Sequence, residues 1–312
     1  MERGEPVSQR LGRDVVHRWP GNPLISVDDL TFQCIDIHNA GIARIDGAVV
    51  LLITIESLEG RCSIHRALSP DGLAFEVEDR PFLAPADEGP FAPYESQGVL
   101  DPRITRMDGT FYVTYLAESE HGFRIGLART DDFVTIERVG LIGEPDLKNG
   151  ALFPRKINGR YALLTRPATG SLWITYSEDL EFWGDSTVVM SPRAGYWDAH
   201  RIGAAGPPIE IDGGWLLLYY GVKETSAGPL FRIGAVVLAP DDPSRVVCRS
   251  NIPILAPREH YERVGDVSNL IFSCGAILEA DGTFKLYYGG AQSCICLGTT
   301  RVEYILDHCQ IH

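Results

Sequence analysis

The sequence predicts an all-β protein, a five-bladed β-propeller, and two observations support this fold class. Short segments in which apolar and polar residues alternate recur along the chain, as expected for strands with one buried face. A hairpin signal, Asp-Gly or Asn-Gly, also returns at intervals of about 50 to 70 residues. One supersecondary unit repeated in this way is typical of propeller blades, whereas a β-sandwich would not give hairpins at such intervals.

In chain order, the expected strands cover residues 48–55, 63–67, 111–116, 123–128, 161–164, 172–176, 215–220, 231–238 and 284–288. The hairpin turns begin at Asp46, Asp108, Asn158, Asp212 and Asp281, and each stands just ahead of one of these strands. A second kind of polar turn follows three strands, at residues 69–72, 130–133 and 177–180. Glycine in the hairpin turns supplies the positive φ that a tight turn requires.

The whole chain, residues 1–312, is expected to form one domain. A length of 312 residues would allow two domains, but propellers and barrels commonly reach this size as one unit. The 32 glycines and 20 prolines are scattered rather than clustered, so no linker is indicated. Short extensions flank the repeats, and the C-terminal one, residues 301–312, is a candidate cover for a neighbouring subunit in a homo-oligomer.

Composition excludes several classes of partner. The net charge of −14, from 42 acidic and 28 basic residues, argues against nucleic acid and anionic membranes. No apolar run reaches the roughly 20 residues of a membrane span, and residues 1–18 are too polar for a signal peptide. A cytoplasmic protein is therefore expected, and its scattered cysteines suit reduced thiols. No cysteine or histidine spacing predicts a metal site.

The first candidate for chemistry is Asp101, in the segment Gly-Val-Leu-Asp-Pro-Arg-Ile-Thr at residues 98–105. A general acid must be fixed within hydrogen-bond reach of the leaving-group oxygen, and the adjacent proline and Arg103 would rigidify and orient this carboxyl group. An Asp-Pro pair alone is more often a turn or a strand cap. The interpretation as a catalytic acid therefore depends on the motifs that follow.

Four further motifs follow in order. They are residues 148–161, which begin Lys-Asn-Gly; 165–167, Thr-Arg-Pro; 197–203, which begin Trp-Asp-Ala-His-Arg; and 214–222, which end Tyr-Tyr-Gly-Val. In these motifs, and over about residues 22–289, the chain resembles glycoside hydrolase family 130. That family holds inverting mannoside phosphorylases and related β-mannosidases on a five-bladed β-propeller. The resemblance implies the same fold and an activity on β-1,2- or β-1,4-linked mannosides.

The resemblance also implies a role for each candidate residue. Asp101 would be the acid that protonates the leaving oxygen. The expected phosphate ligands are Lys148, Arg166, Arg201 and Tyr220, and the expected saccharide ligands are Asn39, Arg61, Arg103, Trp197 and Asp198. Inorganic phosphate is then a co-substrate, mannose 1-phosphate is a product, and no cofactor is implied. One acid and a basic cradle suffice, because phosphate is already an anion and needs no second carboxylate to activate it.

The chain is a divergent member by this comparison. Leu100 stands where many members have glutamate, Tyr220 replaces a histidine, and Gln292 replaces a carboxylate expected to bind sugar hydroxyls. A hydroxyl donor in place of histidine weakens the expected phosphate binding without abolishing it. Two alternatives stay open: a β-mannosidase, with Asp198 or Glu56 as its base, and a glycan-binding propeller without turnover.

Overall fold

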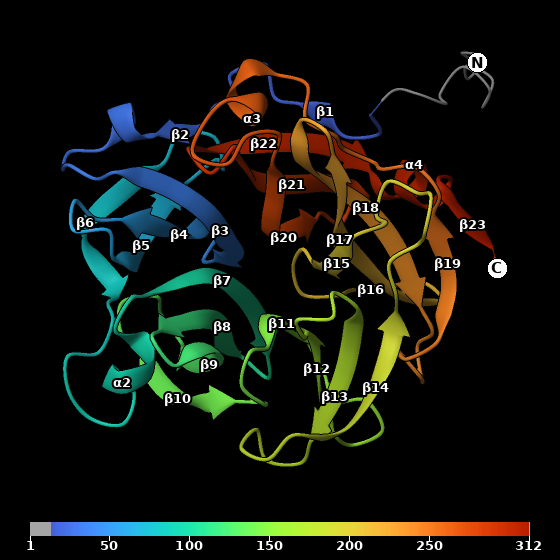
Figure 1. Ribbon diagram of the computed structural model, residues 1–312, viewed down its shortest axis with the longest axis horizontal. Helices are drawn as coiled ribbons and strands as arrows, with labels where there is room; N and C mark the ends of the chain where they lie inside the picture. The colour runs from blue at the N-terminus through green and yellow to red at the C-terminus, as the bar shows by residue number, and fades with distance from the viewer. Residues whose placement is uncertain (1–13, 312) are drawn as a thin grey trace.

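The computed structural model describes residues 14–311 (Figure 1). Most of the expected N-terminal extension, residues 1–13, and the last residue, 312, lie outside the described part. Within it the fold is all-β, as expected, and the helical segments are short: η1 (Val27–Asp29), α2 (Ala92–Glu95), α3 (His260–Arg263) and α4 (Val302–Leu306). Over these residues, no helix has the length and apolar character needed to span a membrane.

The largest sheet contains two antiparallel groups of four strands. The first group is β3 (Asp36–Ile45), β4 (Ala48–Glu56), β5 (Cys62–Ser69) and β6 (Glu76–Leu83), and the second is β7 (Gly98–Met107), β8 (Thr110–Ser119), β9 (Gly122–Thr130) and β10 (Glu137–Ile142). Each group is a meander in which consecutive strands pair. A parallel pair, Cys62 with Gly98, joins the two groups.

Three smaller sheets complete the described chain. The first is β11 (Lys148–Leu152), β12 (Tyr161–Arg166), β13 (Leu172–Ser177) and β14 (Gly184–Met190). The second is β15 (Arg201–Ala204), β16 (Ile209–Ile211), β17 (Gly214–Thr225), β18 (Gly228–Leu238), β19 (Val246–Ser250) and β23 (Cys309–Ile311). The third is β20 (Ile271–Leu278), β21 (Thr283–Gly290) and β22 (Cys294–Arg301), and β22 also pairs with β1 (His17–Arg18) and β2 (Ile25–Ser26). The N-terminal strands therefore belong to the last sheet.

The expected strands are confirmed, since each lies inside an observed strand: β4, β5, β8, β9, β12, β13, β17, β18 and β21. The hairpin turns are also where the Asp-Gly and Asn-Gly signals place them. Asp46, Asp108 and Asn158 have φ angles of 49°, 50° and 50°, and the glycine after each is also at positive φ. These are the backbone angles that make such dipeptides favourable in tight hairpins.

The second recurring turn is built in the same way at its three positions. The hydroxyl groups of Ser69, Thr130 and Ser177 each accept the backbone N–H three residues further on, at 2.8, 2.9 and 2.9 Å. The aspartates two residues after them, Asp71, Asp132 and Asp179, each accept two more backbone N–H groups. The repeat seen in the sequence is thus also a repeat of local hydrogen bonds.

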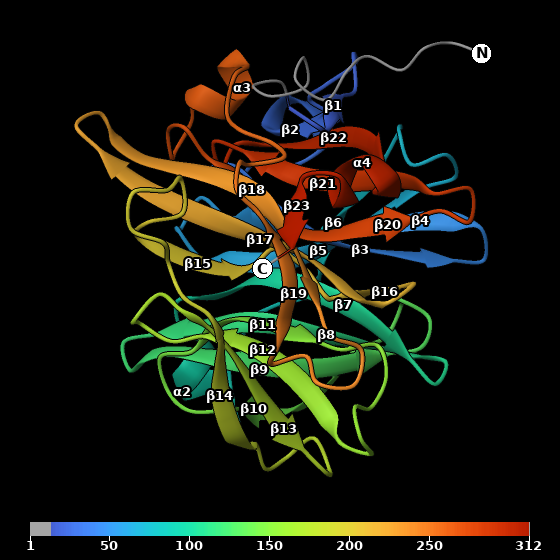
Figure 2. The same cartoon turned by 90° about the vertical axis from the view of Figure 1, so that its right-hand side faces the viewer.

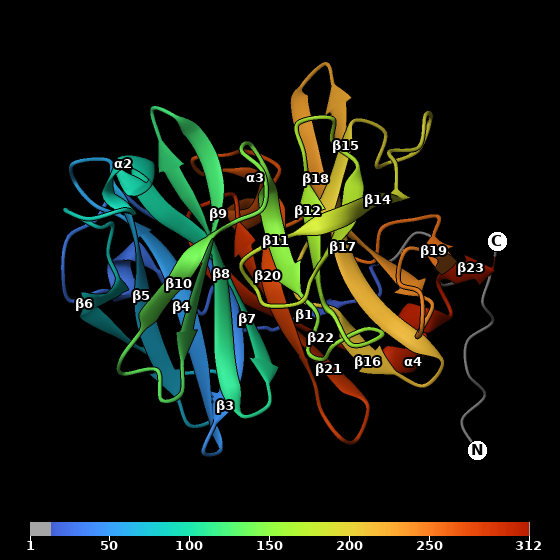
Figure 3. The same cartoon turned by 90° about the horizontal axis from the view of Figure 1, so that it is seen from below.

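The sheets lie around a common centre, with β3, β7, β11, β15 and β20 nearest to it (Figure 1). Figure 2 shows β1 and β2 against β22, and Figure 3 shows α2, the β8–β9 hairpin and the β17–β18 hairpin projecting on one side of the molecule. Apolar side chains fill the space between neighbouring groups. Ile125 and Leu127 of the second strand group, for example, share a buried cluster with Leu152 and Leu163 of the sheet formed by β11 to β14. The centre is thus fixed by packing between sheets.

Candidate active site

The strand register breaks at Asn39 in β3, at Asp101 in β7 and next to Lys148 in β11, and it also breaks in β20. The interrupted positions are His38 and Asn39, Asp101 and Pro102, Asn149 and Gly150, and Ser273 and Cys274. A bulge leaves residues unpaired in the ladder and turns their side chains away from the regular alternation. Asp101 and Asn149 also have positive φ angles, 54° and 57°, which are uncommon outside glycine and often found at functional sites.

Asp101 is held by three neighbours. The Asn39 amide donates to Oδ1 of Asp101 at 2.8 Å, and the backbone N–H of Asp101 donates to Oγ1 of Thr54 at 3.0 Å. The Arg103 guanidinium donates to the backbone carbonyl of Asp101 at 3.0 Å. The carboxyl group is half-buried and fixed by its backbone and by one oxygen. This is the preorganisation that a general acid requires.

Arg103 does not contact the open part of the site. The side chain is 2% exposed, and its other terminal nitrogen donates to the Ala204 carbonyl at 3.2 Å. Its guanidinium carbon also lies 5.9 Å from the centre of the Phe272 ring. That Arg103 binds saccharide stays a prediction. Arg103 ties the backbone of Asp101 to β15.

The cations expected to bind phosphate come together. Lys148 and Arg166 are directly paired across β11 and β12, and Arg201 begins β15. The Lys148 ammonium lies 3.2 Å from the centre of the Phe123 ring, and the Arg201 guanidinium lies 5.2 Å from that of Phe231. Burial lowers the pKa of Lys148, and the charges of Arg166 and Arg201 lower it further, while Glu118 and Asp101 raise it. An anion bound among these cations would relieve their mutual repulsion.

Asn149 links two of the candidates. Its Oδ1 accepts the Tyr220 hydroxyl at 2.8 Å and Nε of Arg166 at 3.0 Å. Tyr220 is 3% exposed, and burial raises its pKa while Arg166, Arg103 and Arg201 oppose the shift. The Tyr220 ring lies over Gly203, where a Cβ would come within 2.6 Å of it. The hydroxyl of Tyr220 is thus directed at Asn149, a residue that the motif analysis did not single out although it adjoins Lys148.

Trp197 and Asp198, which were expected to bind saccharide, are both buried. Trp197 is 7% exposed and stacks on Tyr219, with ring centres 5.4 Å apart. The Asp198 carboxylate is fully buried and accepts from Arg193 at 2.9 Å, Arg249 at 2.6 Å and the Tyr219 hydroxyl at 2.9 Å. This carboxylate network holds the segment that leads into Arg201. It leaves Asp198 unsuitable as a catalytic base.

Two other carboxylates lie near Asp101. Burial raises the pKa of Cys62 to about 12, and the charges of Glu56, Glu118 and Asp101 add to the shift. Glu118 also acts on Lys148, and no local sequence signal singled it out. Arg61, an expected saccharide ligand, is exposed in the β4–β5 hairpin beside Cys62, at the edge of this cluster. Glu56, Glu118 and Asp101 thus all lie close enough to Cys62 to act on it, and Glu118 and Asp101 also act on Lys148.

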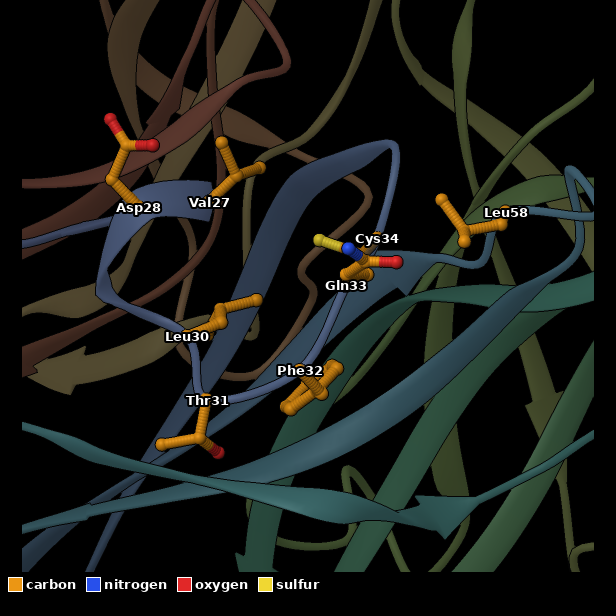
Figure 4. Close-up of a pocket in the computed structure, with 8 residues that line it drawn as sticks. All are labelled: Val27, Asp28, Leu30, Thr31, Phe32, Gln33, Cys34 and Leu58. Atoms are coloured by element: carbon orange, nitrogen blue, oxygen red, sulfur yellow. The ribbon is translucent and has the colours of Figure 1, made fainter.

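Over residues 14–311, no group of three or more His, Cys, Asp or Glu side chains is placed to hold a metal ion. A surface hollow of about 580 Å³ lies outside the beginning of β3 and is lined by Val27, Asp28, Leu30, Thr31, Phe32, Gln33, Cys34 and Leu58 (Figure 4). None of the candidate residues lines that hollow, so the chemistry is assigned to the bulged strands instead.

An all-β scaffold that fixes a carboxyl group near several cations suits the class of enzymes that act on glycosidic bonds. The chain belongs to glycoside hydrolase family 130, whose family model, described as β-1,4-mannooligosaccharide phosphorylase, matches residues 26–311. It is 32% identical over 96% of its length to β-1,4-mannooligosaccharide phosphorylase of Ruminococcus albus, of which the match covers 92%. It is 36% identical to β-1,2-mannobiose phosphorylase of Listeria innocua, over 80% of this chain and 69% of that protein.

A solved structure supports the same assignment. The Listeria innocua β-1,2-mannobiose phosphorylase, in complex with β-1,2-mannobiose, matches 94% of this chain and 98% of its own with a TM-score of 0.86 and 30% identity. A glycosyl hydrolase from Bacteroides ovatus, 23% identical with a TM-score of 0.82 over 93% of this chain and 94% of its own, shares the fold. Family and fold thus agree, although the relatives named here differ in the linkage that they act on.

Proposed function

We propose that this protein is an inverting phosphorylase of β-mannosides, which cleaves β-1,2- or β-1,4-linked manno-oligosaccharides with inorganic phosphate. The observation that carries the proposal is the fixed Asp101 carboxyl beside Lys148, Arg166 and Arg201. Asp101 gives its proton to the glycosidic oxygen as the bond from that oxygen to the anomeric carbon breaks. A phosphate oxygen forms the new bond to that carbon from the opposite face. The products are mannose 1-phosphate, with inverted configuration, and the shortened saccharide.

The arrangement of charge favours phosphate over water as the nucleophile. An inverting hydrolase needs a second carboxylate, on the far side of the sugar, to activate water. Asp198 is occupied by two arginines, and Glu56 lies beside His38, 3.5 Å from its ring, and is paired with Cys62. A β-mannosidase stays a candidate because Glu118 lies close enough to Lys148 to shift its pKa. In that case Glu118 would be the base.

The roles that we propose for the other candidate residues fit this arrangement of charge. Lys148, Arg166 and Arg201 would donate charge-assisted hydrogen bonds to phosphate. Tyr220 is assigned an indirect role, because its hydroxyl donates to Asn149, which also accepts from Arg166. Asn39 orients Asp101, and Arg61 remains a candidate saccharide ligand at the edge of the site.

We further propose that the repeated groups are the five blades of a propeller. Each blade begins with a strand near the centre, β3, β7, β11, β15 or β20, and β1 and β2 complete the last blade. Buried clusters shared between neighbouring groups support one domain over the described residues 14–311, and we propose the same for the whole chain, residues 1–312. A cytoplasmic location, a homo-oligomeric state and the lack of nucleic-acid or membrane partners stay predictions.

The function is tested by incubating the protein with β-1,2- and β-1,4-mannobiose, with and without inorganic phosphate, and measuring mannose 1-phosphate and free mannose. We expect mannose 1-phosphate only when phosphate is present, together with one equivalent of mannose from the second sugar unit. Two equivalents of mannose, formed without phosphate, would instead establish the hydrolase, and Glu118→Gln should then abolish activity. Binding of either disaccharide without any product would establish the glycan-binding alternative.

Replacing Tyr220 by phenylalanine is expected to raise the KM for phosphate about two- to tenfold, because a neutral hydrogen bond that holds Asn149 and, through it, Arg166 is lost. The KM for saccharide should stay unchanged. Steady-state kinetics with each substrate varied in turn would measure both constants, and Arg166→Met provides the comparison for a direct ligand. A loss in Tyr220→Phe as large as that in Arg166→Met would show that Tyr220 itself contacts phosphate.

A further inference from the structure

A buried histidine beside the site has no hydrogen-bond partner. His38 is 5% exposed, and within the described part of the chain neither ring nitrogen makes a hydrogen bond. Its Nε2 lies 3.5 Å from Oε2 of Glu56, the nearest opposite charge when the ring is protonated. Buried polar groups are almost always paired in native proteins, so an unpaired one requires an explanation. The bulge in β3 that directs Asn39 toward Asp101 also places His38 here.

Glu56 adjoins the proposed acid. It ends β4 two residues after Thr54, whose hydroxyl accepts the backbone N–H of Asp101. Residues two apart on a strand share a face, so the side chains of Glu56 and Thr54 point to the same side. Glu56 is directly paired with Cys62, the thiol whose surroundings also include Asp101. The Glu56 side chain is 26% exposed, and it therefore remains within reach of a ligand.

This part of the site is negatively charged. Asp36 is directly paired with Glu56 across β3 and β4, and Asp266 also lies near enough to Asp36 to act on it. Burial raises the pKa of Asp36, and the like charges of Asp266 and Glu56 add to that, whereas the Ile37 N–H and His38 oppose it. A second anion would be repelled here. A sugar hydroxyl, in contrast, can donate to a carboxylate in a charge-assisted hydrogen bond.

We propose that Glu56, oriented by His38, binds hydroxyl groups of the sugar whose glycosidic bond Asp101 protonates. The inference rests on the proposed phosphorolysis and names the residues that recognise the saccharide. Glu56 accepts hydrogen bonds from the hydroxyl groups. His38 is assigned the role of a positioning residue, since its Nε2 lies 3.5 Å from Oε2 of Glu56 and its side chain is the more buried of the two. Recognition of the saccharide and binding of phosphate are thereby separated between Glu56, the carboxylate of β4, and the cations of β11, β12 and β15.

The experiment compares Glu56→Gln with Glu59→Gln, an exposed residue of the same hairpin. We expect Glu56→Gln to raise the KM for β-1,2- or β-1,4-mannobiose roughly tenfold, because charge-assisted hydrogen bonds become neutral ones. The KM for phosphate should not change, and Glu59→Gln should behave as the wild type. An unchanged saccharide KM in Glu56→Gln, in an enzyme that does form mannose 1-phosphate, would overturn the inference and leave the proposed function standing.

His38→Phe tests the positioning role, because it removes both ring nitrogens and keeps an aromatic ring. We expect a smaller rise in saccharide KM than in Glu56→Gln, no change in phosphate KM, and a double variant no worse than Glu56→Gln alone. Additive effects in the double variant would show that His38 does not act through Glu56.

A binding measurement keeps the inference testable if no turnover is found. Calorimetric titration of Asp101→Asn with each mannobiose should give a Kd that Glu56→Gln raises by the same factor. Equal Kd values with and without Glu56→Gln, or no binding of either disaccharide, would overturn the inference. Absence of mannose 1-phosphate from the wild-type protein, with binding still sensitive to Glu56→Gln, would overturn only the proposed function.

Discussion

Replacing Asp101 by asparagine is expected to lower kcat for phosphorolysis by about 10²- to 10⁴-fold, the usual contribution of a positioned general acid. Asparagine has the same shape but carries no transferable proton. Its Oδ1 can still accept the Asn39 amide, and its backbone N–H can still donate to Thr54. The variant should therefore fold normally and bind saccharide with little change in affinity.

The measurement is the rate of mannose 1-phosphate release at saturating phosphate, together with the Kd for mannobiose. Asp131→Asn, an exposed residue of a turn in the second strand group, is the control and should keep full activity. Normal turnover by Asp101→Asn would exclude Asp101 as the acid. A wild-type protein that binds mannobiose without turnover, and whose affinity Asp101→Asn leaves unchanged, would favour the non-catalytic binder.

The strands and hairpins were predictable from the sequence because their signals are local. Alternation over five or six residues identifies a half-buried strand, and Asp-Gly at Asp46 or Asp108 selects a turn whose φ angles few other dipeptides accept. The groups of strands follow from the repetition of these signals. The ends of the strands were harder to predict. β17 and β18 extend well beyond the apolar segments that identify them, because they continue to pair as far as Thr225 and Gly228.

The candidate site was predictable only in part. Charged residues such as Lys148, Arg166 and Arg201 stand out in their motifs, and the structure brings them together, although their roles stay predictions. Asn149 and Glu118 were missed because their positions depend on strands distant in sequence. Asn149 accepts a hydrogen bond from Tyr220, 71 residues later, and no motif around either residue indicates this contact.

The burial of Trp197 and Asp198 was not predictable from the sequence. An aromatic residue beside a carboxylate resembles a sugar-binding pair, but Arg249, 51 residues later, pairs with that carboxylate in the interior. Gly221 and Gly234 leave room for the Trp197 ring, since a Cβ at either position would lie within 2.6 Å of it. Burial of this kind is a property of the assembled sheets, and it has no local sequence signal.

Replacing Asp198 by alanine is accordingly expected to lower the free energy of unfolding by about 3–5 kcal/mol, because two guanidinium groups lose their shared buried counter-charge. Arg193 and Arg249 would each face an empty position, and the Tyr219 hydroxyl would lose its acceptor. The segment that they hold leads directly into Arg201, so the KM for phosphate should rise in the fraction that remains folded. Asp198→Asn, which keeps the shape and loses the charge, should be destabilised less.

Urea unfolding at neutral pH, followed by intrinsic tryptophan fluorescence, measures the effect, since Trp197 is packed on Tyr219 beside the network. Glu137→Ala is the matched control: it removes a carboxylate from an exposed ion pair with Arg129 and should leave the unfolding free energy almost unchanged, because solvent screens that pair. An Asp198→Ala protein as stable as the wild type but defective in saccharide binding would return Asp198 to the role of a sugar ligand. The two outcomes are distinguishable because a buried ion pair affects stability, whereas a ligand affects the affinity for substrate.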